Sequence, residues 1–374
     1  MRNKTLSTLW KFRNTSKVSQ SVGPNLVMTS STCYAQPSNN NKHFSRSYAT
    51  AKRPVVIGGS NVDIVATATE DIKMDGRMLN GTISQCCGGV GRNIANALAR
   101  LNMNPLLLTA IGNDELGQFL VAGSKHMDNK GFLRCKEYNS GCCCVIVDSD
   151  RECKFIIGNM NIHSQISLDW IRKFEEDIMN SSFLVLDGNL GPTAFDYILK
   201  TCHSLNIPVW FEPTDIAVCH VIFSSKEWTS ITHISPNFNE LKHMSSVLTG
   251  KDYSHMNPSS LQDLITQSIT LARNFPKSMV VMVTLGKHGM VLICGDNVKY
   301  YAALPVDNIA NVSGAGDCAV GGYIAAHLCN RSETEKVFAA LSCARQSLMS
   351  TTPVPSHMSL DLGEAKYESY SSQL

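Results

Sequence analysis

The fold of this 374-residue sequence is indicated best by one stretch, Gly314-Ala315-Gly316-Asp317 and the apolar run Cys318–Leu328 that follows it. Its two glycines leave backbone N–H groups free to converge on an anion. The run that follows predicts a helix whose N-terminus points at that anion. A lone carboxylate at Asp317 would repel a phosphate group, but it suits a base that takes a proton from a hydroxyl attacking a phosphoryl group.

Two other interpretations of this stretch are open at this point. Residues 314–319 formally fit the dinucleotide-binding pattern G-x-G-x-x-A. That pattern should follow an apolar strand early in the fold, but here the polar loop Pro305–Ser313 precedes it near the end of the chain. The stretch could also be a glycine-rich helix start that serves only close packing.

The composition favours a globular chain and disfavours two kinds of partner. With 43% hydrophobic and 17% charged residues, the chain can form one large domain or two smaller ones. Beyond residue 53 only 24 of the 33 Lys and Arg remain, against all 31 Asp and Glu, so this part carries a net charge of −7. A nucleic-acid binder would have the opposite sign. No apolar run approaches the ~18 residues that a membrane span needs, so we expect neither nucleic acid nor membrane as a partner.

The first 52 residues form a basic extension. Nine Lys and Arg and no acidic residue occur in residues 1–53. A short amphipathic helix is suggested by Leu6, Leu9, Trp10 and Arg13, and Arg46-Ser47-Tyr48 resembles a matrix-protease cleavage site. We expect residues 1–52 to be a disordered mitochondrial transit peptide; the alternative is a merely basic tail on a cytoplasmic protein.

The 14 cysteines favour a reducing compartment over a metal site. No C-x-x-C pair is matched by a second pair of ligands, so zinc is unsupported. The adjacent runs Cys86-Cys87 and Cys142-Cys143-Cys144 rarely bridge internally. Small reduced residues in apolar segments are the expected state.

From residue 54 onward, strands alternate with helices. Apolar strands are predicted over residues 55–59, 105–111, 183–187, 207–211, 231–235 and 279–284, with a late hairpin over 289–294 and 298–302. Helices are predicted to begin near residues 88 and 112 and to cover 168–180, 193–205, 238–248 and 260–273. This α/β alternation favours a mostly parallel central sheet with helices on both faces.

Two further segments predict a small separate sheet. Residues 64–85 alternate loosely, and the polar turn Asp148–Glu152 separates two β-type runs, which is a hairpin signal. We therefore expect lid strands from about 64–86 and 139–162 that cover a site. His163, just beyond them, is expected to be a structural histidine rather than a catalyst.

Polar residues recur where the predicted strands end: Asp63, Asp187–Asn189, Glu212–Asp215, Asn237–Glu240 and Thr284–Gly286. Ligands of open α/β sheets bind at the carboxyl ends of the strands. A single acid there is often only a cap, but five such ends on one edge favour a site. Gly88-Gly89 with Asn93 opens a predicted helix and is a weaker motif, which packing glycines would explain equally well.

Three motifs together resemble the PfkB or ribokinase-like carbohydrate and nucleoside kinases. Gly314–Asp317 is similar to the family's C-terminal signature, Gly88-Gly89 with Asn93 to its N-terminal one, and Asn237–Glu240 to its N-x-x-E element. The resemblance covers roughly residues 54–350 in the family's order. It implies a PfkB-type kinase domain over 53–374 with a ribokinase-like α/β fold and a small β-sheet lid. It also implies a homodimer joined through the lid.

Within the family the sequence is most similar to the pseudouridine kinases. The similarity lies in Gly59–Asp63, Gly88–Asn93, Gly158–His163, Val209–Asp215 and Ile234–Leu241. It implies ATP-dependent phosphorylation of the 5′-hydroxyl of pseudouridine. A kinase of another sugar or nucleoside, such as ribose or adenosine, and a catalytically silent nucleoside-binding member are the alternatives.

The resemblance also implies roles for the matching residues. Asp317 would deprotonate the acceptor hydroxyl, while the amides of Gly314, Ala315 and Gly316 would hold the transferring phosphoryl group. The sugar would be bound by Asn61, Asp63, Gly88, Gly89, Asn93 and Asp187, ATP by Thr284, Gly286, Asn308 and Val312, and Mg²⁺ by Asn237 and Glu240 through water. Asn311 stands where the family more often has Asp, which leaves a ribokinase-like K⁺ site an open question.

Overall fold

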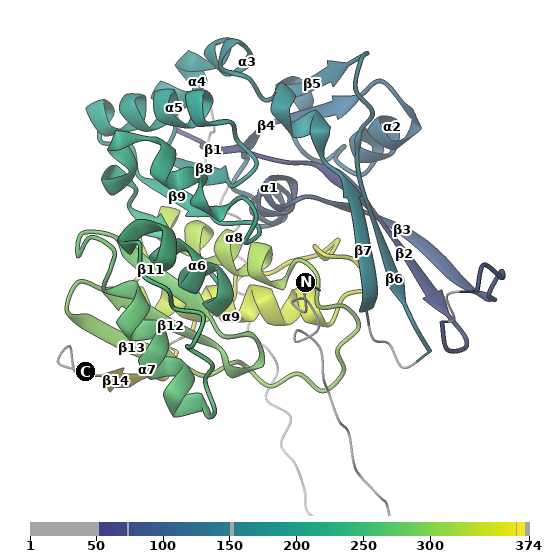
Figure 1. The fold of residues 1–374 in the computed structure, drawn as a ribbon. Helices are drawn as coiled ribbons and strands as arrows, with labels where there is room; N and C mark the ends of the chain where they lie inside the picture. The colour runs from purple at the N-terminus through teal and green to yellow at the C-terminus, as the bar shows by residue number, and fades with distance from the viewer. Residues whose placement is uncertain (1–51, 73–74, 150–152, 364, 371–374) are drawn as a thin grey trace, which may run out of the picture. The chain divides into compact units, whose positions relative to one another are not determined.

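A ten-stranded sheet runs through the computed structural model, which describes residues 52–72, 75–149, 153–363 and 365–370 (Figure 1). Its strand order is β14-β13-β12-β11-β10-β9-β8-β1-β4-β5. The strands are β1 Pro54–Ile57, β4 Leu106–Gly112, β5 Phe132–Cys135, β8 Phe183–Asp187, β9 Val209–Glu212, β10 His233–Ile234, β11 Val280–Thr284, β12 Met290–Cys294, β13 Asn297–Tyr301 and β14 Glu368–Tyr370. The predicted extension over residues 1–52 lies, apart from Lys52, outside the described residues.

The sheet is mostly parallel, as predicted. All neighbours from β11 to β5 are parallel, and β12, β13 and β14 add an antiparallel edge. Every residue of β1 and β8 is buried, as expected for apolar strands covered on both faces. The chain passes from β1 to β4 on one side and later returns to β8 on the other side of β1. This reversal lies beside β1, where such sheets bind their ligands.

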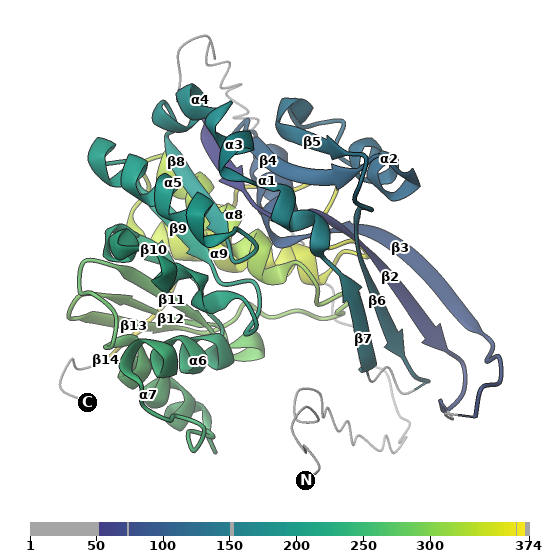
Figure 2. The same ribbon diagram turned by 45° about the horizontal axis from the view of Figure 1, so that its top comes forward.

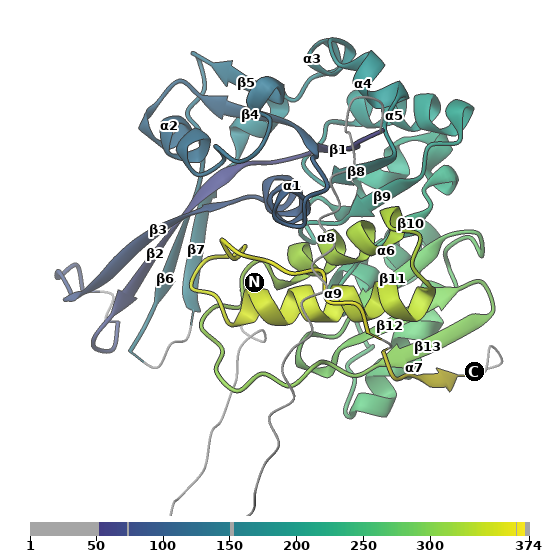
Figure 3. The same cartoon turned by 180° about the vertical axis from the view of Figure 1, so that it is seen from behind.

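Helices cover both faces of the sheet. One face carries α3 Leu168–Arg172, α4 Glu175–Met179, α5 Pro192–Leu205, α6 Phe238–Thr249 and α7 Leu261–Ala272. The other carries α1 Val90–Arg100, α2 Glu115–Ala122, α8 Ala315–Leu328 and α9 Glu333–Leu348, of which α8 and α9 are prominent in Figure 3. A Cβ added at Gly321 would lie 2.7 Å from the Ala97 Cβ, so a glycine lets α8 approach α1.

A four-stranded lid sheet projects from this layered body (Figure 2). Its order is β3-β2-β6-β7, with β2 Asn61–Ala68, β3 Gly81–Gly88, β6 Gly141–Val147 and β7 Cys153–Asn159. β2 and β6 are parallel and the outer pairs are antiparallel. The small lid sheet expected from the sequence is therefore confirmed.

Five elements differ from the sequence-based expectations. The helix predicted over residues 168–180 is two short helices, because Phe174 leaves helical geometry (φ −114°, ψ 20°) and its ring turns inward against Trp170 at 5.0 Å. The strand predicted over 231–235 is reduced to the two residues of β10. Helix α9 and strands β5 and β14 were not predicted. Among the described residues, no helix combines the length and the hydropathy that a membrane span requires.

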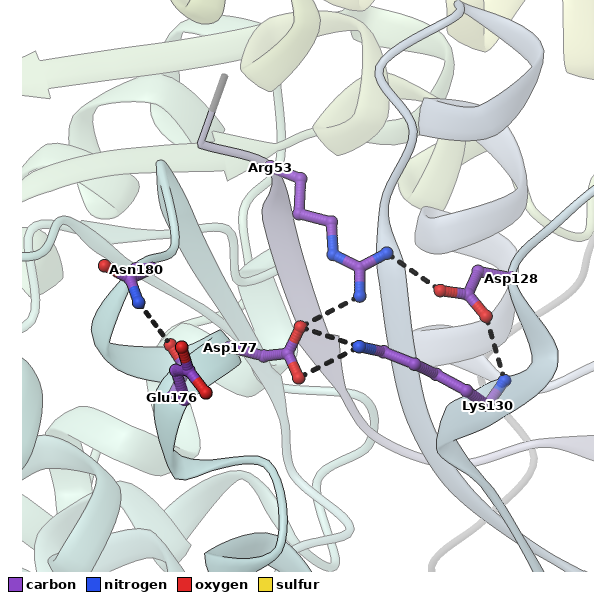
Figure 4. A network of polar contacts seen from close by, with 6 residues as sticks. All are labelled: Arg53, Asp128, Lys130, Glu176, Asp177 and Asn180. Carbon is purple, nitrogen blue, oxygen red and sulfur yellow. Dashed lines mark hydrogen bonds and ion pairs between the residues drawn. The ribbon is translucent and has the colours of Figure 1, made fainter. Parts of the chain in front are cut away.

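The amino-terminal end of β1 is tied to two neighbouring elements by ion pairs (Figure 4). Arg53 donates to Asp128 at 2.9 Å and to Asp177 at 3.0 Å, and Lys130 binds Asp177 at 2.9 Å. Asp177 belongs to α4, and Asp128 caps the short 3₁₀ turn η1, Asn129–Gly131. These contacts hold the amino-terminal end of β1, which is opposite the carboxyl end where ligands of such sheets bind.

Candidate active site

The amino-terminal end of α8 provides an anion-binding position. Gly314 caps the helix with φ 82°, a left-handed conformation that favours glycine, and a Cβ there would lie 2.4 Å from the Pro353 carbonyl oxygen. The first N–H groups of a helix have no partner within it and favour negative charge. A Cβ at Gly316 would meet nothing within 4 Å, so this part of the turn faces open space.

Asp317 lies in the first turn of α8 and keeps part of its surface exposed. Burial raises the pKa of Asp317 to about 7, although the Asn93 Nδ2 group, which donates to its Oδ2 at 2.8 Å, opposes the rise. The negative charges of Asp187, Asp63 and Glu240 raise this pKa further. A carboxyl group whose pKa is close to neutrality is suited to act as a general base.

Asp63 lies on the lid strand β2 and faces the same region. Asn61 Nδ2 donates to its Oδ1 at 2.6 Å, and a Cβ at Gly88 would lie 2.2 Å from its Oδ2, so Asp63 occupies the space that this glycine leaves. Burial raises the pKa of Asp63, while the bond from Asn61 and the charge of Arg92 lower it. Because the charge of Asp63 also raises the pKa of Asp317, the two ends of the predicted site lie within electrostatic reach of each other.

Asp187 binds the backbone of the loops around this region. It is fully buried, and its carboxylate accepts the backbone N–H groups of Gly59 at 2.7 Å, Gly91 at 3.0 Å and Asn189 at 3.0 Å. Gly89, beside them, has φ 93°, and a Cβ there would lie 2.5 Å from the Gly59 carbonyl oxygen. In these contacts Asp187 holds backbone rather than facing open space, and its direct contact with a sugar stays a prediction.

A cavity of about 130 Å³ opens between the starts of α6 and α8; it is lined by Glu212, Ser235, Asn237, Glu240, Thr284, Gly316 and Val320. Glu212 is one of the polar strand-end residues expected at this edge, although no role was predicted for it, and Ser235 was not predicted. Ser235 Oγ donates to Glu212 and accepts from Trp210 Nε1 at 2.6 Å. Burial, with the charge of Glu240, raises the pKa of Glu212 well above its usual range. The position of Glu212 at the end of an apolar strand predicted its place at this edge but not its burial or its partner.

Asn237 and Glu240 form a capping box at the start of α6. Asn237 Oδ1 accepts the N–H groups of Asn239 and Glu240, and Glu240 Oε2 accepts the Asn237 N–H at 2.8 Å. Burial raises the pKa of Glu240 to about 7. The described residues contain no cluster of three His, Cys, Asp or Glu that could cage a metal. The second carboxylate oxygen of Glu240 and the cavity beside it instead fit a cation that keeps part of its hydration, as Mg²⁺ does.

The four residues predicted to bind ATP lie on three segments. Thr284 ends β11 and lines the cavity. Gly286 has φ 58° with open space where a side chain would be. Asn308 and Val312 are exposed in the loop that precedes α8, where Ala310 donates to the Leu348 carbonyl oxygen at 2.8 Å. Of the four, Gly286, Asn308 and Val312 are not among the described residues that line the cavity, so their role stays a prediction.

His163 lies behind the sugar end of the site. It is 5% exposed, and its Nε2 is 3.3 Å from the Ser60 carbonyl oxygen. A Cβ at Gly59 would lie 2.7 Å from its ring. This burial is consistent with the structural role that we expected for it.

Comparison with known proteins agrees with this geometry. The description "pfkB family carbohydrate kinase" matches residues 51–356. The chain is 24% identical over 361 residues to the pseudouridine kinase of Arabidopsis thaliana, covering 83% of this chain and 94% of that protein. It is 25% identical over 307 residues to the pseudouridine kinase of Escherichia coli K12, covering 79% and 90%.

Solved structures show the same fold. The ribokinase of Arabidopsis thaliana complexed with ribose and ATP aligns with a TM-score of 0.67 at 20% identity, covering 83% of this chain and 96% of that one. The fold is thus ribokinase-like, with a mostly parallel sheet, helices on both faces and a small lid sheet. The family match spans most of the chain and includes each of the three predicted motifs. The chain belongs to the pfkB family of carbohydrate kinases.

Proposed function

We propose that this protein transfers the terminal phosphoryl group of ATP to the 5′-hydroxyl of pseudouridine, giving pseudouridine 5′-phosphate and ADP. The observation that carries the proposal is the pairing of Asn93 with Asp317 at the start of α8, within electrostatic reach of Asp63 on the lid. Two relatives named pseudouridine kinase, at 24% and 25% identity, are the reason for proposing pseudouridine as the acceptor.

In the proposed reaction Asp317 takes the proton of the acceptor hydroxyl as its oxygen bonds to phosphorus and the bond to ADP breaks. The Asp317 Oδ1 atom accepts no hydrogen bond from the described residues, so it is the oxygen that would receive the proton. The N–H groups at Gly314, Ala315 and Gly316 would stabilise the charge that develops on the phosphoryl oxygens. Asp63 and Asn61 would bind the ribose hydroxyls, with Gly88 leaving room for the Asp63 carboxylate and Gly89 for the close approach of the Gly59 backbone.

Asn237 and Glu240 would hold Mg²⁺ through water, and this ion would neutralise charge on the phosphate groups of ATP. Thr284 lies in the same cavity, beside the expected phosphates. Closure of the lid sheet would exclude water, which competes as a phosphoryl acceptor. A K⁺ requirement is not part of the proposal, since Asn311 departs from the family pattern.

The proposal extends to assembly and location. The lid exposes apolar side chains, among them Ile83, Ile156 and Ile157, which are 75%, 61% and 67% exposed. Such a surface would suit a homodimer joined through the lid. The basic extension over residues 1–52 would direct the protein to mitochondria; sedimentation and localisation of a tagged protein would test these two points.

The decisive experiment offers ATP with pseudouridine, uridine, ribose and adenosine in parallel and measures kcat/KM for each. We expect pseudouridine to give the highest value and Asp317→Asn to remove turnover while ATP binding persists. A preference for another acceptor, with turnover still dependent on Asp317, would support the kinase activity but reject pseudouridine as its substrate.

A ribose kinase is the second candidate, since the fold aligns with a ribokinase complexed with ribose and ATP and the sugar end contains no assigned base-binding residue. A catalytically silent nucleoside-binding protein is the third candidate. It would bind nucleoside without consuming ATP in the same assay.

A further inference from the structure

Arg92 is a cation buried in the wall of the candidate site, and the proposed chemistry does not yet use it. It lies in the first turn of α1 with 4% of its surface exposed. In the described part of the chain its guanidinium forms no salt bridge with a carboxylate; its contacts are to backbone and amide oxygens. Burying a charge without an ionic partner loses hydration energy. A role of the Arg92 guanidinium in the site would offset this loss.

The guanidinium joins three elements around the site. Its Nη1 donates to the Cys87 carbonyl oxygen at 3.1 Å and to Asn93 Oδ1 at 3.3 Å, and its Nη2 donates to the Gly123 carbonyl oxygen at 3.1 Å. Cys87 belongs to the lid strand β3, and Gly123 ends α2. Arg92 therefore connects the base of the lid and α2 to the side chain that contacts Asp317.

The contact with Asn93 decides which way its amide group faces. A carboxamide has an acceptor end and a donor end. With its oxygen held by a guanidinium, the Asn93 nitrogen faces Asp317 and donates to Oδ2 at 2.8 Å. The reversed amide would put NH₂ against a cation and oxygen against a carboxylate, and both contacts would be repulsive. A donor whose own oxygen is bound by a cation is also polarised towards stronger donation.

We propose that Arg92 is a positioning residue for phosphoryl transfer, which holds the Asn93 oxygen so that its amide N–H faces Asp317 and leaves the other carboxylate oxygen open to the acceptor hydroxyl. This inference rests on the proposed function. The titratable groups that act on Asp317 from the surrounding strands and α6 are all acidic: Asp63, Asp187, Glu212 and Glu240. The Asn93 N–H is thus the contact that favours the ionised base, and Arg92 orients it.

The first test compares the pH dependence of kcat/KM in Arg92→Lys and Arg92→Met with that of the unmodified protein. Without the oriented donor the base binds its proton more tightly, so the acid limb should move up by about one pH unit and the rate at pH 7 should fall about fivefold. Raising the pH to 9 should restore most of the loss. Arg100→Lys, at the other end of α1, is the matched control and should leave the limb in place. A loss that is equal at every pH would overturn the inference.

A double-mutant cycle tests whether the effect passes through Asn93. In an Asn93→Ala background, Arg92→Lys should move the acid limb no further than Asn93→Ala alone. An equal shift in both backgrounds would show that Arg92 acts by another route and would overturn the inference.

A measurement that needs no turnover separates this inference from the proposed function. The Asp317 carboxyl carbon can be titrated by NMR, with Asp317→Asn to assign its signal. Its midpoint should rise in Arg92→Lys, and an unchanged midpoint in a folded variant would reject the positioning role even if no acceptor were phosphorylated. Because Arg92→Lys keeps the charge, it remains the test variant if Arg92→Met does not fold.

Discussion

The two carboxylates at the ends of the candidate site lie in regions of opposite burial. Asp317 belongs to α8, in which nine of 14 residues are buried and which shares its hydrophobic cluster with α1 and α9. Asp63 belongs to β2, whose residues from Asp63 to Ala68 are all only half-buried in the lid sheet. The candidate base is thus anchored in the core, whereas the candidate acceptor-binding group belongs to a thin, partly exposed layer.

This difference suggests how binding and chemistry are divided between the two regions. Elements with few buried apolar contacts open at a lower free-energy cost than core elements. The lid can therefore move without disturbing the base, and its closure can exclude water. Substitutions on α8 should mainly lower kcat, whereas substitutions on β2 should mainly raise KM for the acceptor.

The largest expected effect comes from Asp317→Asn. This change removes the proton acceptor but keeps the size of the side chain, so kcat should fall by about a thousandfold or more. Steady-state kinetics with ATP and the best acceptor would measure it. Glu335→Gln, the same chemical change in the first turn of α9, should have almost no effect. If Asp317→Asn kept kcat within tenfold of the unmodified value, α8 would not carry the base.

Asp63→Asn should have a smaller effect of a different kind. Losing charge-assisted hydrogen bonds to the sugar should lower kcat/KM about tenfold to a hundredfold, chiefly through the KM of the acceptor. The KM of ATP should stay unchanged. Thr67→Ala, further along β2, is the matched control. A fall confined to kcat would mean that Asp63 on β2 acts on the chemical step, as Asp317 on α8 does, and not on acceptor binding.

The pH profile should give the next largest effect. Because the pKa of Asp317 is raised to about 7, the fraction of ionised base falls tenfold per pH unit below that value. kcat/KM should therefore decline in proportion towards pH 5. A flat profile between pH 5 and 8 would contradict the assignment of Asp317 as the base.

The raised pKa of Asp317 affects stability in the opposite direction to activity: as pH rises, activity should increase and stability should decrease. A carboxyl group whose pKa is raised in the folded state stabilises the fold below its unfolded pKa and loses this contribution as pH rises towards about 7. Asp317→Asn should consequently melt at a higher temperature than the unmodified protein at pH 8, but not at pH 4. A melting temperature equal to that of the unmodified protein at pH 8 would argue that burial does not strain this carboxylate.

Most of the central sheet could be predicted from the sequence, because its strands are short Val- and Ile-rich runs that need burial on both faces. The break before Phe174 could not, since apolar spacing continues across it and only the core shows where the ring goes. Strand β14 exists through its pairing with β13, a contact between distant segments for which the local sequence gives no signal.

The candidate site was predictable where its chemistry resides in contiguous motifs, as at Gly314–Asp317 and around Asn93. No role was predicted for Arg92 or Glu212, although Glu212 was expected among the polar strand ends, because what distinguishes them is burial and the partner that each finds elsewhere in the chain. Gly123, which ends α2, and Ser235, which follows β10, are those partners, and the folded chain brings them into place. A charged residue inside an apolar helix start was the only signal at Arg92.

The smallest expected effect lies at the opposite end of β1, where Arg53→Ala tests whether the site is independent of the far edge of the sheet. The Arg53 ion pairs with Asp128 and Asp177 are partly exposed (side chains 21%, 34% and 26% exposed), so their loss should lower the free energy of unfolding by about 1 kcal/mol and the melting temperature by about 2 °C. Although burial opposes it, the bond from Arg53 lowers the pKa of Asp128, and the bonds from Lys130 and Arg53 lower the pKa of Asp177, so this stabilisation should disappear below about pH 4. Lys277→Ala, which breaks the exposed pair with Asp296, should change the melting temperature less. Turnover should be unaffected in both variants, since neither contact reaches the carboxyl ends of the strands; a fall in kcat for Arg53→Ala alone would mean that the far edge of β1 helps to position the base after all.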